Sequence, residues 1–378
     1  MGQGAVTAKA STFLEGKDER LEVLSERPLV LSTPPGLLSG TRITPTDRVF
    51  VRNIQDLPGS QTLDAAATQG WEIELVGLIE PERLVIQAED LLEMEQVDFE
   101  MVLVCSGNGR SMYPNIPGTP WDHGGVANVR FSGVPLSAVL DKHHVKVDPQ
   151  VEYVTAAGRG VPMPGEPPDV EHSLPVADVL ERSILALGLN GEGLPGIHGG
   201  PVRLVTPGLF GTMQIKWLHQ LRFEISESPC FYHANEYRIP LSPVRDGEPF
   251  EFTLENSRPT WHIRMMSYIF SPEQGASVAA GDIAVSGVAY NDGSARLEAA
   301  LVSVDRGKTW RTTTLETPES PYAWYRWSTQ VRLETGEHEI WVRAIDDMGR
   351  SQPLDGNVHW NPNGYEWTGV YKTGVTVG

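Results

Sequence analysis

The chain has 378 residues, of which 40% are hydrophobic and 21% charged, and its formal net charge is -19. A globular chain of this length can bury a sizeable core and fold as two domains. The excess of negative charge argues against nucleic acid or an anionic membrane surface as a partner, and no apolar run approaches the roughly 20 residues that a membrane-spanning helix needs. The chain has two cysteines, which excludes a disulfide framework, a CxxCH haem attachment site and a four-cysteine iron–sulfur site.

The first 240 or so residues predict a mixed α+β domain. Residues 1 to about 40 are polar and interrupted by Pro34-Pro35-Gly36, so we expect an arm that lies over this domain. Helical periodicity marks Leu136 to Leu140 and Val176 to Leu187. Apolar runs between Gly/Pro-rich connections predict strands at Trp71 to Ile79, Val97 to Val104, Val151 to Ala156, Pro201 to Val205 and Leu218 to Ile225.

The pattern changes after a cluster of prolines and charged residues between residues 240 and 251, which favours a domain boundary there. We therefore expect a first domain at residues 1–245 and a second at residues 246–378. Strand-like runs separated by turn sequences follow at Ile283 to Tyr290, Leu297 to Val304, Thr309 to Leu315, Tyr322 to Leu333 and His338 to Ile345. Short strands at this spacing predict an immunoglobulin-like β-sandwich.

The most informative stretch runs from Val104 to Arg110 and contains one of the two cysteines, Cys105. The preceding apolar run predicts a buried strand, and the Gly-Asn-Gly turn after Ser106 lets the backbone approach a bulky ligand closely. Arg110 supplies a fixed charge that supports a thiolate and can hold an oxyanion near it. Taken alone, a lone buried cysteine is more often a small core residue than a ligand.

Four blocks, in a fixed order, cover nearly the whole chain. They are Phe50-Val51-Arg52-Asn53; Cys105 to Arg110 with Trp121 and Asn128 to Leu136; His198 to Arg203 with Lys216-Trp217-Leu218; and Trp360 to Tyr365. Together they resemble the sulfite oxidase family of molybdenum-cofactor oxidoreductases, in the form of a haem-free bacterial sulfite dehydrogenase. The family's fold is a molybdopterin-binding domain followed by an immunoglobulin-like domain that carries the dimer contact.

The resemblance implies a molybdenum–molybdopterin cofactor and no haem in this chain. Cys105 matches the cysteine that binds the metal in the family. A pterin that ends in a phosphate needs cationic donors and free backbone amides. The residues assigned to this cofactor are Asn53, Cys105, His198, Arg203 and Lys216.

The resemblance also implies a pocket for a small anion, made of Arg52, Arg110, Trp121 and Tyr237. Sulfite is largely dianionic at neutral pH, so its pocket should bring arginines together with neutral donors. The phenol of Tyr237 can donate a hydrogen bond or relay a proton as electrons leave.

Two residues depart from the family pattern and weaken the inference about the substrate. Ile54 stands where many members have histidine, and Asn363 stands where animal and plant sulfite oxidases have a third arginine. The pocket is then less polar and less cationic, unless Arg130, Arg238 or Arg350 supplies the missing charge.

The sequence therefore predicts a sulfite dehydrogenase that oxidises sulfite to sulfate by oxygen atom transfer and passes electrons to an external acceptor, such as a basic cytochrome c. A homodimer through the second domain is expected. The N-terminus has neither a twin-arginine pair nor an apolar signal core, which predicts a cytoplasmic protein; a removed signal peptide and a periplasmic location is the alternative.

Two other functions stay open. One keeps the cofactor and acts on another sulfur compound or on an S- or N-oxide, which would suit Ile54 and Asn363. The other is a cofactor-free binding subunit, against which the joint presence of Cys105, His198, Arg203 and Lys216 argues.

Overall fold

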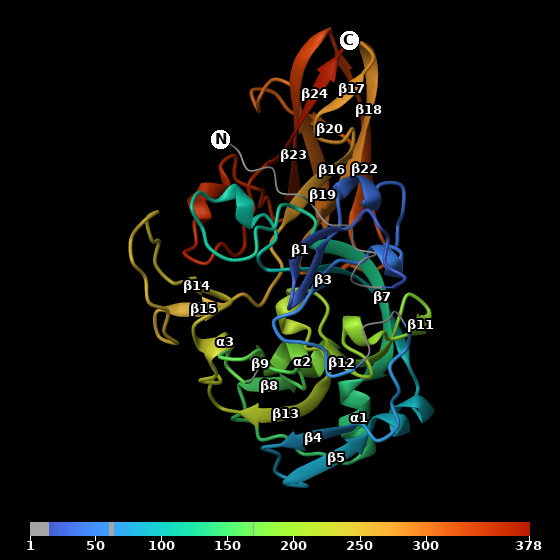
Figure 1. Cartoon of the computed structure of the whole chain (residues 1–378), viewed down its shortest axis with the longest axis vertical. Helices are drawn as coiled ribbons and strands as arrows, with labels where there is room; N and C mark the ends of the chain where they lie inside the picture. The colour runs from blue at the N-terminus through green and yellow to red at the C-terminus, as the bar shows by residue number, and fades with distance from the viewer. Residues whose placement is uncertain (1–14, 60–63, 169) are drawn as a thin grey trace.

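The computed structural model describes residues 15–59, 64–168 and 170–378 (Figure 1). Strands dominate this part of the chain, and its α-helices are short: α1 (Leu136–Lys142), α2 (Val176–Arg182) and α3 (Phe231–Ala234). Short 3-10 helices lie at Pro35–Leu38, Thr46–Arg48, Ala88–Glu93, Arg110–Met112, Gly196–His198, Gly211–Met213 and Gly356–His359. No helix in these ranges is long and apolar enough to cross a membrane.

The N-terminal arm forms a small sheet of its own. Strands β1 (Glu22–Glu26), β2 (Leu29–Ser32) and β3 (Val51–Arg52) pair antiparallel in that order. Every residue of β2 is buried, and Leu31 and Val51 share an apolar cluster with Ile197 of the first domain. The arm is therefore more regular than we expected from its polar composition, because its few apolar residues alternate onto a buried face. The expectation for residues 1–14 lies outside the described residues.

The strand that leads to Cys105 belongs to the first of two five-stranded sheets in the first domain. Its order is β11 (Glu192–Gly193), β10 (Ile184–Leu189), β7 (Val126–Pro135) and β6 (Val97–Val104), with β12 (Arg203–Val205) also paired to β10. β6 begins and ends where the sequence predicts, and its last five residues are buried. Val104 pairs with Val126 at the end of the ladder, so Cys105 leaves the sheet at a fixed place.

The prediction of a helix through Leu187 is wrong beyond Arg182. Helix α2 ends there, and residues 184–189 form β10, whose six residues are all buried between β7 and β12. A continuous apolar run shows no periodicity that could distinguish a buried strand from a buried helix. Here the neighbouring strands β7 and β12, which pair with these residues, determine that they form a strand.

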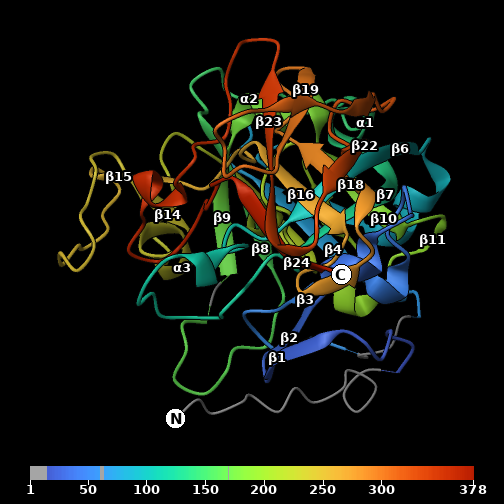
Figure 2. The same ribbon diagram turned by 90° about the horizontal axis from the view of Figure 1, so that it is seen from above.

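The second five-stranded sheet holds the other core of the first domain. Its order is β5 (Arg83–Gln87), β4 (Glu72–Val76), β13 (Leu218–Glu224), β8 (Tyr153–Gly158) and β9 (Val170–Pro175), and only the β4–β13 pair is parallel. Apolar residues of α1 and α2 complete this core, including Leu136, Val139 and Val179. Strands β14 (Arg238–Pro240) and β15 (Ser257–Pro259) form a separate pair that projects from one side (Figure 2).

The C-terminal part is a sandwich of two sheets. One sheet has the order β16 (Met266–Ser271), β18 (Gly281–Tyr290), β22 (Tyr325–Leu333) and β21 (Thr314–Glu316). The other has the order β17 (Ala276–Val278), β24 (Tyr371–Val377), β23 (Gly336–Asp346), β19 (Leu297–Ser303) and β20 (Arg311–Thr312). The run from Thr309 to Leu315 is not one strand, because the chain crosses between sheets at Thr313.

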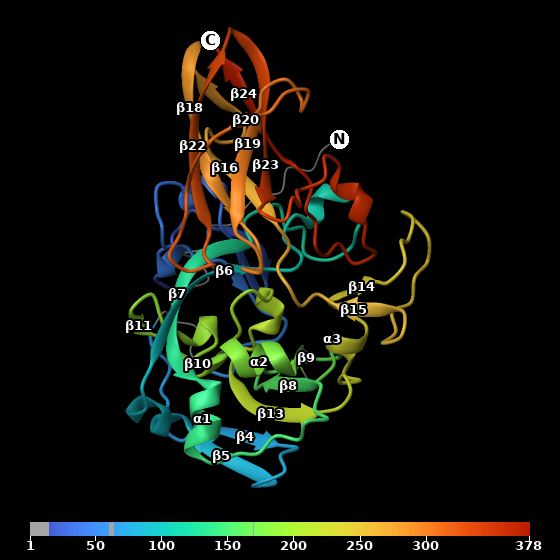
Figure 3. The same ribbon diagram turned by 180° about the vertical axis from the view of Figure 1, so that it is seen from behind.

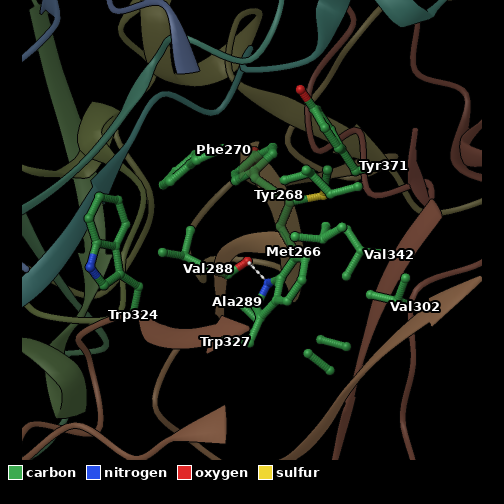
Figure 4. Packing of buried hydrophobic residues seen from close by; sticks show 14 of the residues in the cluster. Met266, Tyr268, Phe270, Val288, Ala289, Val302, Trp324, Trp327, Val342 and Tyr371 are labelled. Carbon is green, nitrogen blue, oxygen red and sulfur yellow. Dashed lines mark hydrogen bonds between the residues drawn. The ribbon is translucent and has the colours of Figure 1, made fainter. Parts of the chain in front are cut away.

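Large aromatic side chains fill the space between these sheets (Figure 4). The indole nitrogen of Trp327 donates a hydrogen bond to the carbonyl oxygen of Val288 at 3.1 Å, so this polar atom is satisfied although the ring is buried. Strand β7 of the first domain lies directly beneath the sandwich (Figure 3), and Val102 and Val126 join the same apolar cluster. The two halves of the molecule therefore share one core.

A stability prediction follows from this core. Ile340 in β23 is fully buried between the sheets, so Ile340→Ala should lower the free energy of unfolding by about 2 to 5 kcal/mol. The exposed Gln330→Ala in the neighbouring sheet is the control and should change it by less than about 0.5 kcal/mol. Urea unfolding followed by tryptophan fluorescence measures both, and equal effects would contradict the assigned core.

Candidate functional site

A cavity that is partly open to solvent lies in the first domain at the end of β6. Its walls come from β3, from the segment after β6, from the segment that leads into β9 and from both sides of β12. Its polar lining residues are Arg52, Asn53, Gln55, Cys105, His198, Arg203, Thr212, Gln214, Lys216 and Tyr237.

Cys105 provides the thiol in the cavity wall. Its backbone N–H donates to the carbonyl oxygen of Gly125 at 2.9 Å, which continues the β6–β7 pairing past the last strand residue. A Cβ atom at Gly125 would lie 3.3 Å from the Cβ atom of Cys105 and 3.1 Å from the ring of Trp121. Glycine at this position therefore lets the two segments approach each other closely.

Four basic side chains meet on one side of the cavity. The Lys216 ammonium donates to Oδ1 of Asn53 at 2.7 Å and to the carbonyl oxygen of Ile197 at 3.0 Å. The guanidinium of Arg203 donates to the carbonyl oxygen of His198 at 3.0 Å. The fourth member is Lys17, whose ammonium lies 2.9 Å from Nε2 of His198.

The backbone around His198 makes this convergence possible. Gly199 has φ of 106°, which a residue with a side chain rarely adopts. A Cβ atom there would also lie 2.9 Å from the Cβ atom of Lys216. Gly199 therefore lets the His198 turn and the Lys216 segment approach each other.

The basic cluster has no carboxylate in the cavity wall, since none of the described lining residues is Asp or Glu. Burial lowers the pKa of Lys17 to about 7, with Asp47 acting in the opposite direction, and lowers the pKa of Arg203 to about 9. Burial and then the neighbouring positive charges hold the pKa of Lys216 and of His198 well below their usual values. The arrangement favours an anion as the ligand.

The polar atoms left without a partner indicate what else the ligand offers. Nδ2 of Asn53 and Oε1 of Gln55 are buried and make no hydrogen bond in the described structure. Buried polar groups without partners are rare, and a ligand with both donors and acceptors would satisfy these two. A pterin with a terminal phosphate fits this set of residues, with Cys105 as the thiolate that a soft metal prefers.

A second part of the cavity combines an arginine with a tyrosine. A guanidinium nitrogen of Arg52 donates to the hydroxyl oxygen of Tyr237 over 3.5 Å. Tyr237 has φ of 54° and stacks on Tyr365 with ring centroids 5.1 Å apart. Burial raises the pKa of Tyr237, with the charge of Arg52 acting in the opposite direction, so the phenol stays protonated at neutral pH.

Two of the predicted pocket residues lie outside the cavity lining. The guanidinium of Arg110 donates to the carbonyl oxygens of Asn363 at 3.0 Å and Thr119 at 3.2 Å, and lies 5.1 Å from the ring centroid of Tyr365. Trp121 is fully buried and packs edge to face on Phe50. In this structure both residues support the cavity wall from behind, and their contact with a substrate stays a prediction.

Of the two departures from the family pattern, Ile54 lines the cavity and Asn363 does not. Ile54 packs against the cluster of Tyr232, Tyr237 and Tyr365, which makes this wall less polar. The backbone N–H of Asn363 donates to Oδ1 of Asn361 at 2.8 Å, and its carbonyl oxygen holds Arg110.

The three arginines considered as substitutes for the missing charge are paired with carboxylates elsewhere. Arg238 donates to Glu227 at 2.7 Å, Arg350 lies 2.6 Å from Asp346, and Arg130 lies 3.7 Å from Glu100. None of them lines the cavity. Within the described residues, the arginines that line the cavity are Arg52 and Arg203.

Sequence reasoning missed Lys17, Gln55 and Tyr365. Lys17 stands in the arm, where no motif marks it. Its ammonium reaches His198 in the cavity wall and also donates to the carbonyl oxygens of Thr46 and Val49, although Lys17 does not itself line the cavity. Tyr365 is the last residue of the fourth sequence block, Trp360 to Tyr365, and its place in that block is the signal that could have identified it.

Comparisons with known proteins agree with this geometry. Residues 60–232 match the family described as oxidoreductase molybdopterin binding domain, and residues 257–377 match the Mo-co oxidoreductase dimerisation domain. Mouse mitochondrial sulfite oxidase is 30% identical over 358 residues, which is 91% of this chain and 63% of that protein. Barley NAD(P)H nitrate reductase is also 30% identical, over 87% of this chain and 38% of its own length.

A solved structure shares the whole fold. The crystal structure of the sulfane dehydrogenase SoxCD from Paracoccus pantotrophus superposes with a TM-score of 0.76 at 26% identity, covering 98% of this chain and 92% of that one. The chain thus spans about 63% of the length of the mouse enzyme but nearly all of this bacterial structure.

The basic cluster generates a prediction for the ligand-free chain. Pyrophosphate at about ten times its Kd should add about 1.4 kcal/mol of stability and raise the Tm by roughly 2 °C at pH 6.5. The gain should fall as pH rises through about 7 and then about 9, because Lys17 and then Arg203 lose their charge. Thermal melts across this range measure it.

The matched variants are Lys17→Met and Lys308→Met, of which Lys308 is exposed on the sandwich. The first should reduce the stabilisation by pyrophosphate at pH 6.5, and the second should leave it unchanged. An equal response of both variants would contradict an anion site at the cluster.

Proposed function

Because the chain belongs to the sulfite oxidase family of molybdopterin oxidoreductases, we propose that it oxidises sulfite to sulfate in the cavity next to Cys105. Electrons then pass to an external one-electron acceptor, such as a small basic cytochrome. In this reaction one sulfite and one water give one sulfate, two protons and two electrons.

The observation that carries the proposal is the pairing of a thiol with an uncompensated basic cluster in one cavity. The chain has more acidic than basic residues and a net charge of -19, yet none of the described residues that line the cavity is acidic. Buried positive charge without a partner is costly, so its retention supports a bound anion.

His198, Arg203, Lys216 and Lys17 would hold the phosphate end of the cofactor, and Asn53 and Gln55 would satisfy its hydrogen-bonding groups. Cys105 would bind the molybdenum through its thiolate. When bound, this cofactor supplies the oxygen atom transfer and the two-electron redox change. The polypeptide supplies the charge, the fixed geometry and the exclusion of water around it.

Arg52 would bind the substrate anion, since it is the arginine that lines the cavity beside Tyr237. Its charge offsets the cost of bringing a dianion out of water. Tyr237 would donate its phenolic hydrogen to an oxygen of the substrate. Tyr365 holds the Tyr237 ring in place by stacking, and the hydroxyl of Tyr365 is fixed by Glu236 at 2.7 Å.

A second candidate keeps the cofactor and changes the substrate to a less charged sulfur compound, such as a sulfane sulfur. The packing of Ile54 against the tyrosine cluster that contains Tyr237 favours it, because a cavity wall of this kind suits a substrate with little charge. The fold likeness to a sulfane dehydrogenase is compatible with this candidate. Relative kcat/KM values for sulfite and for an uncharged sulfur compound such as a sulfoxide distinguish the two.

We also propose that the protein forms a homodimer through its C-terminal sandwich, which matches a dimerisation domain and which we interpret as immunoglobulin-like. The acidic surface would attract a basic electron acceptor by electrostatic steering, with rates that fall as salt rises.

The experiment that tests the function is metal analysis of the chain purified from a host able to make the cofactor, followed by sulfite-dependent ferricyanide reduction. Near-stoichiometric molybdenum with turnover supports sulfite oxidation. Molybdenum without sulfite turnover moves the assignment to the second candidate, and no molybdenum contradicts both.

A first substitution tests the metal ligand. Cys105→Ser should abolish turnover, because a hydroxyl is a poor donor to a soft metal. The melting temperature should stay within a few degrees of that of the unchanged chain, since the replacement is nearly isosteric. Full turnover per molybdenum in this variant would rule out the assigned ligand.

A second substitution tests the anion pocket. Arg52→Gln should raise the KM for sulfite by roughly tenfold to a hundredfold, as expected for loss of a charge-assisted hydrogen bond of about 1.5 to 3 kcal/mol. The control is Arg130→Gln, which removes the same charge from an exposed site beside Glu100. Equal KM values for both variants would contradict the role of Arg52.

A further inference from the structure

Two buried histidines and a glutamate lie behind the cavity wall, on the side of Tyr237. Val170 of β9 lines the cavity, and His172 follows two residues later on the same face of the strand. The ring of His172 packs edge to face on the ring of Tyr237, with centroids 5.4 Å apart. His172 is thus separated from the cavity by one side chain.

These side chains form a continuous polar chain from the wall toward solvent. Nδ1 of His172 lies 3.4 Å from Nδ1 of His233, and Nε2 of His233 lies 2.9 Å from Oε2 of Glu227. Both histidines are buried, while the side chain of Glu227 is 14% exposed. The chain of contacts therefore begins beside the cavity and ends at water.

The hydrogen bonds around His233 fix which nitrogen carries each hydrogen. The backbone N–H of Ser173 points at Nδ1 of His233 over 3.4 Å and can only donate, so this nitrogen accepts. His233 then carries its hydrogen on Nε2, toward Glu227. His172 shares this one lone pair with Ser173, also over 3.4 Å, and donates to it from its own Nδ1, which leaves a lone pair on Nε2 of His172.

That Nε2 atom of His172 is buried and has no hydrogen-bond partner in the described structure. A buried acceptor without a partner is costly and needs an explanation. Burial and then the charges of His233 and Arg238 hold the pKa of His172 well below its usual value. Burial also lowers the pKa of His233, with Glu227 acting in the opposite direction. Both rings are therefore neutral at neutral pH and able to accept a proton.

Glu227 has the properties of the outer end of such a chain. Burial alone would raise its pKa, but hydrogen bonds from His233 and Arg238 lower it, so the carboxylate is ionised at neutral pH. Arg238 also donates to the carbonyl oxygen of His233 at 3.0 Å and to Oγ of Ser257 at 2.7 Å. These bonds fix both the histidine and the carboxylate.

We propose that His172, His233 and Glu227 form a proton relay that carries protons released in the cavity to solvent. The inference rests on the proposed function, in which two protons leave for each sulfite oxidised while the electrons go to the external acceptor. These three are relay residues, distinct from the residues that would touch the substrate.

Each transfer conserves protons along the relay. A proton from the cavity binds Nε2 of His172 as the hydrogen on its Nδ1 moves to Nδ1 of His233. The hydrogen on Nε2 of His233 then moves to the carboxylate of Glu227, which releases it to water. A flip of each ring restores the starting arrangement before the next proton.

The test uses the molybdenum-loaded enzyme with the variants His172→Gln and Glu227→Gln, which keep hydrogen bonding but cannot relay a proton. Both should lower kcat per molybdenum by about tenfold or more, the scale of positioned proton transfer. KM should change little, and the solvent deuterium isotope effect on kcat should increase. Glu227→Asp should restore most of the activity.

The control is His219→Gln on β13, which β8 separates from β9 in the same sheet. His219 is also partly buried with a lowered pKa and an unpaired Nδ1, but it has no contact with the relay. It should leave kcat and the isotope effect unchanged. A double variant of His172→Gln with Tyr237→Phe should lose less than the product of the two single losses, because both act on one path.

Three results would overturn the relay. They are wild-type kcat in both glutamine variants, an unchanged isotope effect, or losses explained entirely by lower molybdenum content. An enzyme without sulfite turnover contradicts the proposed function instead, and the relay is then measured on the sulfur compound that it does oxidise.

A readout independent of activity is available in the ligand-free chain. Nitrogen-15 NMR of labelled histidines should show His172 neutral with hydrogen on Nδ1 and His233 neutral with hydrogen on Nε2, each assigned by its glutamine variant. The opposite tautomer at either ring, or a positive charge at neutral pH, would contradict the direction of the relay.

Discussion

Buried positive charge without an acidic partner is the constraint on which the site depends. Lys17, Arg203 and Lys216 come from separate parts of the first domain, and the repulsion between their positive charges opposes folding in the absence of a ligand. The apolar packing of the small N-terminal sheet against Ile197 keeps Lys17 in place despite this repulsion. The binding of an anion would turn an unfavourable arrangement into a favourable one.

The candidate site residues Cys105, Arg52 and Arg203 lie at or next to the ends of β-strands, which hold them rigidly. Cys105 continues the β6–β7 ladder through its bond to Gly125, so its position follows from the register of two long strands. Arg52 ends β3, and Arg203 begins β12. Sites built on strands hold their geometry better than sites on loops, which suits a metal ligand and an anion pocket.

The sequence predicted those features that depend on neighbouring residues in the chain. β6 and the start of α1 follow from an apolar run and its end, and Cys105 follows from its motif. The role of Lys17 could not be predicted, because it depends on a fold that brings the arm to His198. β10 shows the same limit, since only its neighbours in the sheet distinguish a strand from a helix. Arg110 and Trp121 match motif positions, yet sequence cannot tell whether a side chain faces a cavity or supports it.

The segment that returns from the sandwich to the first domain ties the two together. Its Tyr365 stacks on Tyr237, Asn363 holds Arg110, and the backbone N–H of Glu366 donates to the carbonyl oxygen of Ser106 one residue after Cys105. Arg258 and Arg264 both bind the carboxylate of Glu366. A chimera that exchanged this sandwich for another would leave the cavity wall unfinished. In recombination or engineering, the first domain and the C-terminal sandwich must therefore be kept together as a single unit.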